Sequence, residues 1–308
     1  MLNWRSQRVR AWYYQAVLIG MLIVLVGWLL QNTLGNMRMR GIQSGFDFLL
    51  DPAGFDIGES MFTFTATQTY GAAFLAGLFN TLRVSGIAIV LCTLWGTILG
   101  IGRLSSNALA RGLCYAYTEL FRNIPLLLQL LMWYVVLVEL MPDTETPLRF
   151  RDWVLLSKEG LALPRVMSAG LTLTPEFLAL TFGLTLYTSA FVAEVIRSGI
   201  QSVPLGQIEA ALSIGLSPSQ RLRLVVLPQA LRLIVPPLTN QYLNAIKNSS
   251  LAVAIGYPDL VSISNTTLNQ TGRAVECIAI VMAVYLALSL LTASGMNYFN
   301  RRAALKER

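Results

Sequence analysis

The sequence predicts an all-α protein that crosses a membrane about six times, and three observations support this fold class. Of the 308 residues, 55% are hydrophobic and only 13% are charged, whereas soluble domains carry roughly 25% charged residues. Long tracts contain no Asp, Glu, Lys or Arg: Ala11–Met37, Val84–Gly102, Asn123–Val138, Phe177–Ala193 and Cys277–Asn300. They approach or exceed the roughly 17–25 residues that cross a hydrocarbon core as a helix. In lipid, the backbone N–H and C=O groups must form their hydrogen bonds within their own segment, which favours helices. The alternative is a soluble protein in which these helices are buried.

Six spans are predicted in order along the chain. The first is expected to remain uncleaved, because no small-residue cleavage site of a signal peptide follows Leu30; a cleaved signal is the alternative. Prolines interrupt the fifth, but membrane helices tolerate proline where neighbouring groups satisfy the freed carbonyls. The predicted spans are Trp12–Gln31, Thr81–Gly102, Leu113–Leu140, Thr174–Arg197, Leu227–Lys247 and Ala274–Phe299.

The distribution of Lys and Arg predicts the orientation. With the amino terminus in the cytoplasm, the short inside segments hold twelve basic residues and the longer outside segments hold seven. The positive-inside rule then places both termini in the cytoplasm, which requires an even number of spans. Six satisfies this, and so does eight if a re-entrant segment near Leu251–Ile263 is counted. The long outside loops, Asn32–Gly77 and Met141–Leu173, are expected to brace the protein or to contact an extracytoplasmic partner.

The composition excludes several kinds of site. The chain has no histidine, which removes histidine-based catalysis and the commonest transition-metal ligand. Its three cysteines lie in or beside apolar tracts, so neither a disulfide framework nor a thiolate metal site is indicated. There is no GxxxxGK[ST] phosphate-binding loop. We therefore expect no bound cofactor, no metal site and no enzymatic activity in this chain, and no nucleic acid as a partner.

The connection between the fourth and fifth spans carries the clearest functional signal. Pro204 suits a first helical position, and Gly215 can adopt the positive φ that ends a helix. Ser217 and Gln220 have the spacing of a capping box. The connection is therefore expected to form two short helices on the cytoplasmic side. The alternative is that these helices only connect the two spans and have no further function.

The spacing within this connection resembles the EAA loop of the permease subunits of bacterial ABC importers, with valine in place of the usual isoleucine. The matching residues are Glu209, Ala210, Ala211, Gly215, Val225, Leu227 and Pro228. In that family the loop forms the coupling helices, which dock in a groove on the ATPase subunit. The resemblance therefore implies a type I ABC importer transmembrane domain, with ATP and magnesium bound by a partner ATPase.

Further segments resemble the polar amino acid branch of that family, over about Thr69–Arg302. They are Gly77–Leu82, Glu119–Gln129, Ala193–Gln207 and Asn244–Leu251. The additional first span resembles the Q-type subunit of the general L-amino acid permeases. This implies an N-terminal part at residues 1–76, a permease domain at 77–302 and a cytoplasmic tail at 303–308. It also implies a second, homologous permease subunit in a heterodimer and a periplasmic amino acid-binding protein.

Polar side chains within the spans mark a candidate substrate path, because they are costly in lipid. Asn240 and Asn244 are four residues apart and share a helix face. The candidate residues are Asn240, Asn244, Gln129, Thr188 and Ser249. The alternative is that these side chains form hydrogen bonds between helices. For the two asparagines both interpretations stay open, and for Gln129 and Thr188 the alternative is favoured. Glu194 and Arg197 are expected to form a structural ion pair at the root of the connection.

The resulting hypothesis is a permease subunit of an ATP-driven, binding-protein-dependent importer of polar or general L-amino acids in the bacterial inner membrane. An ion-coupled secondary transporter without an ATPase is the main alternative. The connection between the fourth and fifth spans and the lack of a conspicuous carboxylate relay within the spans disfavour it. A membrane enzyme is disfavoured by the absence of histidine and of clustered acids within the spans.

Overall fold

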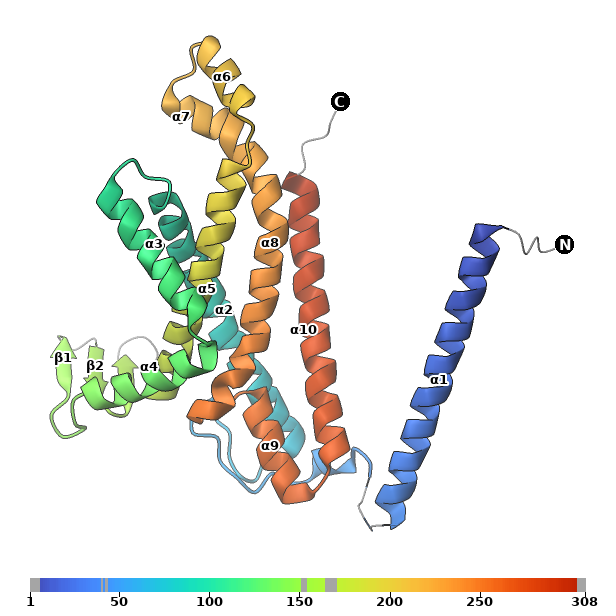
Figure 1. Cartoon of the computed structure of the whole chain (residues 1–308). Coiled ribbons are helices and arrows are strands. Elements are labelled where there is room, and N and C mark those ends of the chain that lie inside the picture. Colours follow the sequence, from blue (N-terminus) through green and yellow to red (C-terminus); the bar gives the residue numbers. More distant parts are fainter. Residues whose placement is uncertain (1–5, 40, 42–43, 151–153, 164–170, 304–308) are drawn as a thin grey trace.

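The computed structural model describes residues 6–39, 41, 44–150, 154–163 and 171–303, and this part of the chain is mostly helical (Figure 1). Five helices are long and apolar enough to cross a membrane, or up to six if a bent pair is one span. The predicted all-α membrane fold is therefore confirmed. The helices are α1 (Gln7–Met39), α2 (Tyr70–Gly102), α3 (Ala108–Asn123), α4 (Leu126–Leu140), α5 (Pro175–Gln201), α6 (Leu205–Ser213), α7 (Pro218–Arg221), α8 (Leu227–Asn248), α9 (Leu260–Thr271) and α10 (Ala274–Ala303).

The third predicted span, Leu113–Leu140, is not one straight helix. It divides into α3 and α4, whose axes are bent by 106°, so that α4 runs across the direction of the other long helices (Figure 1). Pro125 explains the break, because a residue that precedes proline is driven out of the helical region. Ile124 is accordingly extended, with φ −99° and ψ 129°. The charge-free tract is present as predicted, but its path through the bundle is not straight.

The central helix of the bundle is α5, which is buried along most of its length. In its most apolar window, 67% of the residues are buried, whereas none are in the corresponding window of α1. Leu180 and Leu184 are fully buried against Val84 and Ala88 of α2, with Leu130 of α4 in the same apolar cluster. The elements that approach α5 therefore define the core, and α1 stands apart from it (Figure 1).

Glycines allow α2 to approach α5 closely. Gly96 and Gly100 are four residues apart on α2 and face α5. A Cβ atom at Gly96 would lie 2.6 Å from the Val192 Cβ, and one at Gly100 would lie 2.8 Å from the Ala193 carbonyl oxygen. Small residues at this spacing let membrane helices pack backbone to backbone, where lipid provides no hydrophobic drive for association.

The loop between α4 and α5 contains a small antiparallel sheet, which the sequence did not predict. Its strands pair in the order β1-β2-β3-β4. Leu156 lies opposite Leu148 of one neighbouring strand and Leu161 of the other. Gly160 has a φ of +113°, a conformation that favours glycine, at the turn between β2 and β3. The strands are β1 (Leu148–Phe150), β2 (Val154–Ser157), β3 (Gly160–Leu163) and β4 (Leu171–Leu173).

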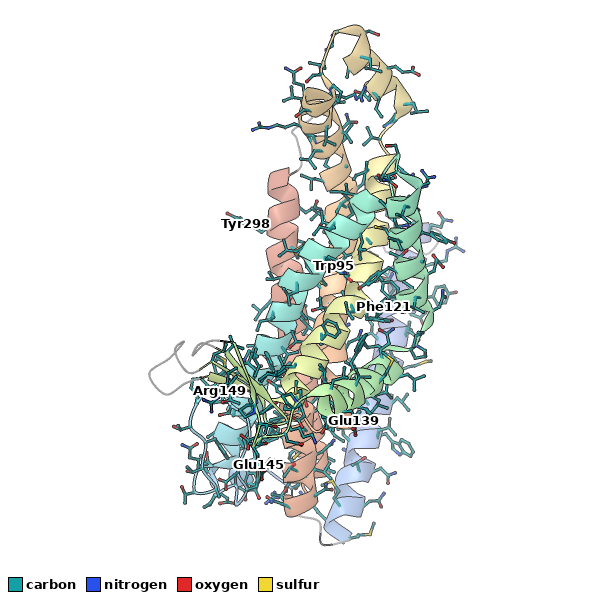
Figure 2. The ribbon with its side chains drawn as sticks, turned by 90° about the vertical axis from the view of Figure 1, so that its left-hand side faces the viewer. Trp95, Phe121, Glu139, Glu145, Arg149 and Tyr298 are labelled. Carbon is teal, nitrogen blue, oxygen red and sulfur yellow. The ribbon has the colours of Figure 1, made fainter. Side chains whose placement is uncertain are left out.

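The bundle has two ends of different character. We call the end with α6 and α7 the loop end, and the end with β1–β4 the sheet end (Figure 1). Glu139, Glu145 and Arg149 lie toward the sheet end, and Trp95 and Phe121 lie in the helical body between the two ends (Figure 2). The first turn of α1 and the last turn of α10 both point toward the loop end (Figure 1). This arrangement is expected when the chain crosses the membrane an even number of times, with α1 and α10 included.

Candidate functional site

The loop end is formed by the connection that the sequence analysis identified. α6 follows Pro204, and Gly215 then adopts a φ of +78°, the left-handed conformation that closes a helix. The Ser217 hydroxyl accepts a hydrogen bond from the Gln220 N–H, and the Gln220 side chain accepts one from the Ser217 N–H at 3.0 Å. The predicted capping box is therefore present, and it fixes the start of α7.

The second helix of this connection is not a separate short helix, which corrects the sequence-based expectation. One π-helical turn, Leu222–Val226, joins α7 to α8 without a break. Pro228 has no N–H to donate, and the Gln229 side chain donates to the Val225 carbonyl at 3.0 Å. Single π-helical turns of this kind are frequent at functional sites. α7 and the spanning helix α8 therefore form one continuous helical segment.

The predicted coupling residues differ in exposure. Glu209, Ala210 and Leu227 are exposed, Pro228 is half-buried, and Ala211 is only 3% exposed. Large apolar side chains are also exposed at the loop end: Leu205, Leu212, Ile214, Leu222 and Leu224. An exposed apolar surface of this kind is typical of a contact with another protein or with a membrane.

An ion-pair cluster lies on α5 at the root of the loop end. Glu194 pairs with Arg197, as predicted, and also with Arg103, the residue that follows α2. Arg122 of α3 lies 4.0 Å from the same carboxylate. One acid therefore joins three helices directly beneath the α6–α7 segment.

A small polar pocket of about 130 Å³ lies between α5 and α8. It brings together Thr188 and Asn244, two of the predicted path residues. The rings of Tyr187 and Phe191 lie 4.9 Å apart beside them. The pocket is lined by Tyr187, Thr188, Phe191, Gln241, Asn244 and Asn248. Amide and hydroxyl groups of this kind can hydrogen-bond ammonium and carboxylate groups, while aromatic faces contact an aliphatic side chain.

Thr188 and Asn244 were predicted from the sequence, whereas the other two amides of the pocket, Gln241 and Asn248, and its aromatic residues were not. Tyr187 and Phe191 are four residues apart and therefore lie on one face of α5 next to Thr188. That spacing was the available signal. It was obscured because aromatic residues are common throughout the spans.

The other predicted path residues do not line this pocket. Asn240 is exposed on α8, and with Asn244 and Lys247 it forms an exposed polar stripe along one face of the helix. Ser249 is buried, and its hydroxyl donates to the Ile246 carbonyl at 2.7 Å. An exposed polar stripe on a spanning helix is costly in lipid. The stripe therefore requires contact with water or with another protein.

Gln129 is also apart from the pocket, at the break between α3 and α4. Its side-chain amide donates to the carbonyl oxygens of Phe121 and Ile124, each at 2.9 Å. These are carbonyls that the end of α3 leaves without a helical partner. The side chain is only 2% exposed, so this position of Gln129 stabilises the bend.

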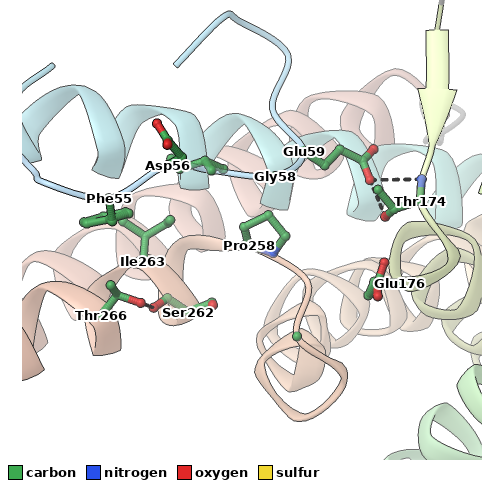
Figure 3. A pocket seen from close by; sticks show the side chains of 12 residues that line it. Phe55, Asp56, Gly58, Glu59, Thr174, Glu176, Pro258, Ser262, Ile263 and Thr266 are labelled. Atoms are coloured by element: carbon green, nitrogen blue, oxygen red, sulfur yellow. Dashed lines mark hydrogen bonds between the residues drawn. The ribbon is translucent and has the colours of Figure 1, made fainter. Parts of the chain in front are cut away.

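A larger cavity of about 410 Å³ lies at the sheet end, between the segment that precedes α2 and the start of α9 (Figure 3). Glu59 forms part of its wall and is only 6% exposed. Its carboxylate accepts hydrogen bonds from Arg83 at 2.7 Å and from the Thr174 N–H at 3.2 Å. The Asn80 amide donates to the Glu59 carbonyl at 2.7 Å and to the Pro258 carbonyl at 2.9 Å. This network ties α2, α5 and the start of α9 together.

The segment that precedes α2 is also attached to α10. Arg273, directly before α10, donates to the Asp47 carboxylate and to the Gly45 carbonyl, each at 3.2 Å. Glu276 accepts a hydrogen bond from the Gly45 N–H at 2.8 Å. Within the described residues, the long segment that precedes α2 therefore braces the sheet end, which is one of the two roles expected for it.

Asp259 caps α9 at the same end. Its carboxylate accepts a hydrogen bond from the Ser262 N–H at 2.8 Å. The side chain is 1% exposed, and burial raises the pKa of the Asp259 carboxyl to about 7, although backbone hydrogen bonds oppose this shift. Desolvation disfavours the charged form of a carboxyl. The sheet end thus contains a buried acid that titrates near neutral pH.

These features are those of a helical membrane-spanning protein with an exposed apolar surface at its loop end. The family model described as binding-protein-dependent transport system inner membrane component matches residues 92–305. The chain belongs to this family.

The comparisons with individual proteins agree with this assignment. YhdX of Escherichia coli (strain K12) is 40% identical, with 100% of this chain and 97% of YhdX covered. The general L-amino acid transport system permease protein AapQ of Rhizobium johnstonii is 38% identical, with 98% of this chain and 94% of that protein covered. The resemblance to the polar amino acid permease branch is therefore confirmed.

Among solved structures, a crystal structure of an amino acid ABC transporter with histidines is similar to this chain. The TM-score is 0.60 at 29% identity, and the match covers 76% of this chain and 95% of that chain. The shared architecture confirms the transmembrane-domain fold that the sequence motifs imply.

Proposed function

We propose that this chain is the permease subunit of an ATP-driven importer of polar or general L-amino acids and that the loop end is the docking site of its ATPase. The exposed apolar surface at the loop end, continuous with the spanning helix α8, carries this proposal. The similarity to AapQ, a general L-amino acid transport system permease protein, supports the substrate class. ATP and magnesium are held by the partner ATPase, and this chain hydrolyses none.

In this mechanism, the energy of ATP enters through the Glu209–Pro228 segment. ATP binding closes the ATPase dimer and moves α6 and α7. Because α7 is continuous with α8, α8 shifts relative to α5 and changes access to the polar pocket between them. The Tyr187 and Phe191 rings and the Asn244 amide contact the amino acid while it passes.

The exposed polar stripe on α8 supports a second permease subunit. Asn240, Asn244 and Lys247 cannot face lipid at low cost, whereas a homologous subunit would enclose them in a shared aqueous path. We infer a heterodimer whose substrate cavity lies between the two subunits. The loop end then faces the cytoplasm with both termini, and the sheet end receives a periplasmic amino acid-binding protein.

A pair of substitutions at Gly215 tests the coupling role. A β-branched residue is strongly disfavoured at the positive φ of this position, whereas asparagine tolerates it. Among the described residues, no neighbouring heavy atom lies within 4 Å of a Cβ atom there, so the backbone conformation separates the two variants. Gly215→Ile should abolish amino acid uptake by the reconstituted complex and Gly215→Asn should retain it, with both inserted in the membrane.

Equal uptake by the Gly215→Ile variant and the unmodified protein would contradict coupling through this loop. Omitting the ATPase from the proteoliposomes distinguishes the proposed importer from a secondary transporter. Uptake that persists without the ATPase and follows an ion gradient would identify a secondary transporter. Loss of uptake without the ATPase is the result expected here.

A further inference from the structure

A third cavity lies near the loop end and is lined by three arginines; it belongs neither to the polar pocket between α5 and α8 nor to the exposed loop surface. Its volume is about 380 Å³, and it lies where α2 ends, α3 begins and α5 approaches its last turn. Arg103, Arg111 and Arg197 line it from these three helices. The volume is within the roughly 300–1,000 Å³ of small-molecule sites.

The charges around this cavity do not balance. Arg103 and Arg197 share one carboxylate, that of Glu194. Arg111 donates to the Ser105 carbonyl at 3.2 Å, and within the described residues no carboxylate forms an ion pair with it. Three guanidinium groups therefore face one carboxylate, which leaves an excess of positive charge that an anion would neutralise.

The guanidinium groups are oriented, and the space between them is open. The Arg103 guanidinium lies over the Tyr115 ring, 5.3 Å from its centre. A Cβ atom at Gly112 would meet no heavy atom within 4 Å in the part of the chain that the structure describes, so α3 presents an unfilled surface to the cavity. Planar guanidinium groups fixed in this way bind phosphate oxygens by paired hydrogen bonds.

The surroundings of the cavity indicate the source of the phosphate group. Ile101, Leu109 and Leu113 are 55%, 72% and 63% exposed, and they lie on α2 and α3 beside the arginines. Basic pockets between spanning helices bind the headgroups of anionic lipids. Apolar side chains at the membrane boundary would at the same time contact the acyl chains.

We propose that this cavity binds the phosphoryl headgroup of an anionic phospholipid. Arg111 and Arg103 hold the phosphate oxygens, and the acyl chains lie along Ile101, Leu109 and Leu113. Because Arg103 and Arg197 also hold Glu194, the bound lipid stabilises the junction of α2, α3 and α5 beneath the loop end. The free phosphate ion presents the same oxygens and is the other source that the cavity could accept.

Lipid binding to the full complex, purified with its partner subunits, tests this proposal. Phosphatidylglycerol is titrated and its retention is measured by native mass spectrometry, with phosphatidylcholine and inorganic phosphate in parallel. Arg111→Gln should weaken phosphatidylglycerol binding by about fivefold or more, as expected for the loss of one basic contact. Arg111→Lys should retain more of the binding, since it keeps the charge.

Arg10→Gln is the matched control, because Arg10 is an exposed arginine in the first turn of α1 and does not line the cavity. It should leave binding unchanged. If inorganic phosphate displaces phosphatidylglycerol only from proteins that retain Arg111, the result supports a site for the phosphoryl group. If this displacement is weak, the lipid is the preferred source of that group. Equal retention of phosphatidylcholine, or equal effects of the Arg10 and Arg111 variants, would overturn the proposal.

Discussion

Side-chain hydrogen bonds occur at both ends of the bundle, but those at the sheet end are buried and those at the loop end are exposed. At the sheet end, Glu59 is 6% exposed and holds Arg83 and Thr174. At the loop end, the Ser217 cap and its Gln220 partner are exposed. Breaking a buried charge pair leaves an uncompensated charge, whereas an exposed group regains water. The comparison indicates that the sheet end holds the subunit together and that the loop end is available for docking.

The largest effect is expected at Glu59. Glu59→Gln leaves the guanidinium of Arg83, whose side chain is 12% exposed, without its carboxylate. Breaking a buried pair in this way costs about 3–5 kcal/mol of folding free energy. Thermal unfolding of the purified complex should show a clear loss of stability.

The matched control is Glu145→Gln, because Glu145 is an exposed acid toward the same end. It should leave the unfolding temperature unchanged. If Glu59→Gln and Glu145→Gln unfold at the same temperature, the Glu59 network does not hold the sheet end together, and the contrast between the two ends fails.

A smaller and local effect is expected at Ser217. Removing an N-cap hydroxyl costs about 1 kcal/mol. Ser217→Ala should therefore speed hydrogen exchange of the α7 amides by about fivefold, while global unfolding of the complex is unchanged. Ser219→Ala is the control, because Ser219 is exposed in the same helix and does not cap it. Equal exchange in the two variants would show that the cap does not order the loop end.

A pH-dependent effect on stability is expected at the sheet end. The pKa of the Asp259 carboxyl is raised by burial to about 7 in the folded protein, against about 3.9 in an unfolded chain. The folded state then binds more protons between these values, so the contribution is fully present below about pH 4 and is lost as pH rises through 7. Asp259→Asn keeps a capping residue and should remove this slope from thermal unfolding. The exposed Asp51→Asn should not, and an unchanged slope in Asp259→Asn would exclude Asp259 as its source.

Much of the architecture could be predicted because the bilayer imposes a simple requirement on the sequence. Charge-free tracts of sufficient length are helices in the structure, and α5 and α10 lie on the predicted spans. The capping box and the positive φ of Gly215 followed from local backbone preferences, which depend on few neighbours. Such features are encoded within a few consecutive residues.

Other features depend on contacts between distant parts of the chain. The bend at Pro125 was readable from the proline, but hydropathy alone describes that tract as continuous. The Glu59 network joins residues from three separate segments, and nothing in the spacing of Glu59, Arg83 and Thr174 brings them together. The continuity of α7 with α8 was also missed, because Pro228 indicated a helix break and a π-helical turn accommodates it instead.

Crosslinking tests most directly whether the loop end receives the ATPase. A cysteine is introduced at Ser213, exposed in α6, or at Met61, which is 56% exposed in the segment that precedes α2. The complex is treated with a short bifunctional thiol reagent after the native cysteines have been replaced by alanine. Ser213→Cys should crosslink to the ATPase subunit, and Met61→Cys should not. No crosslink from Ser213→Cys, or equal crosslinks from both positions, would contradict docking at the loop end.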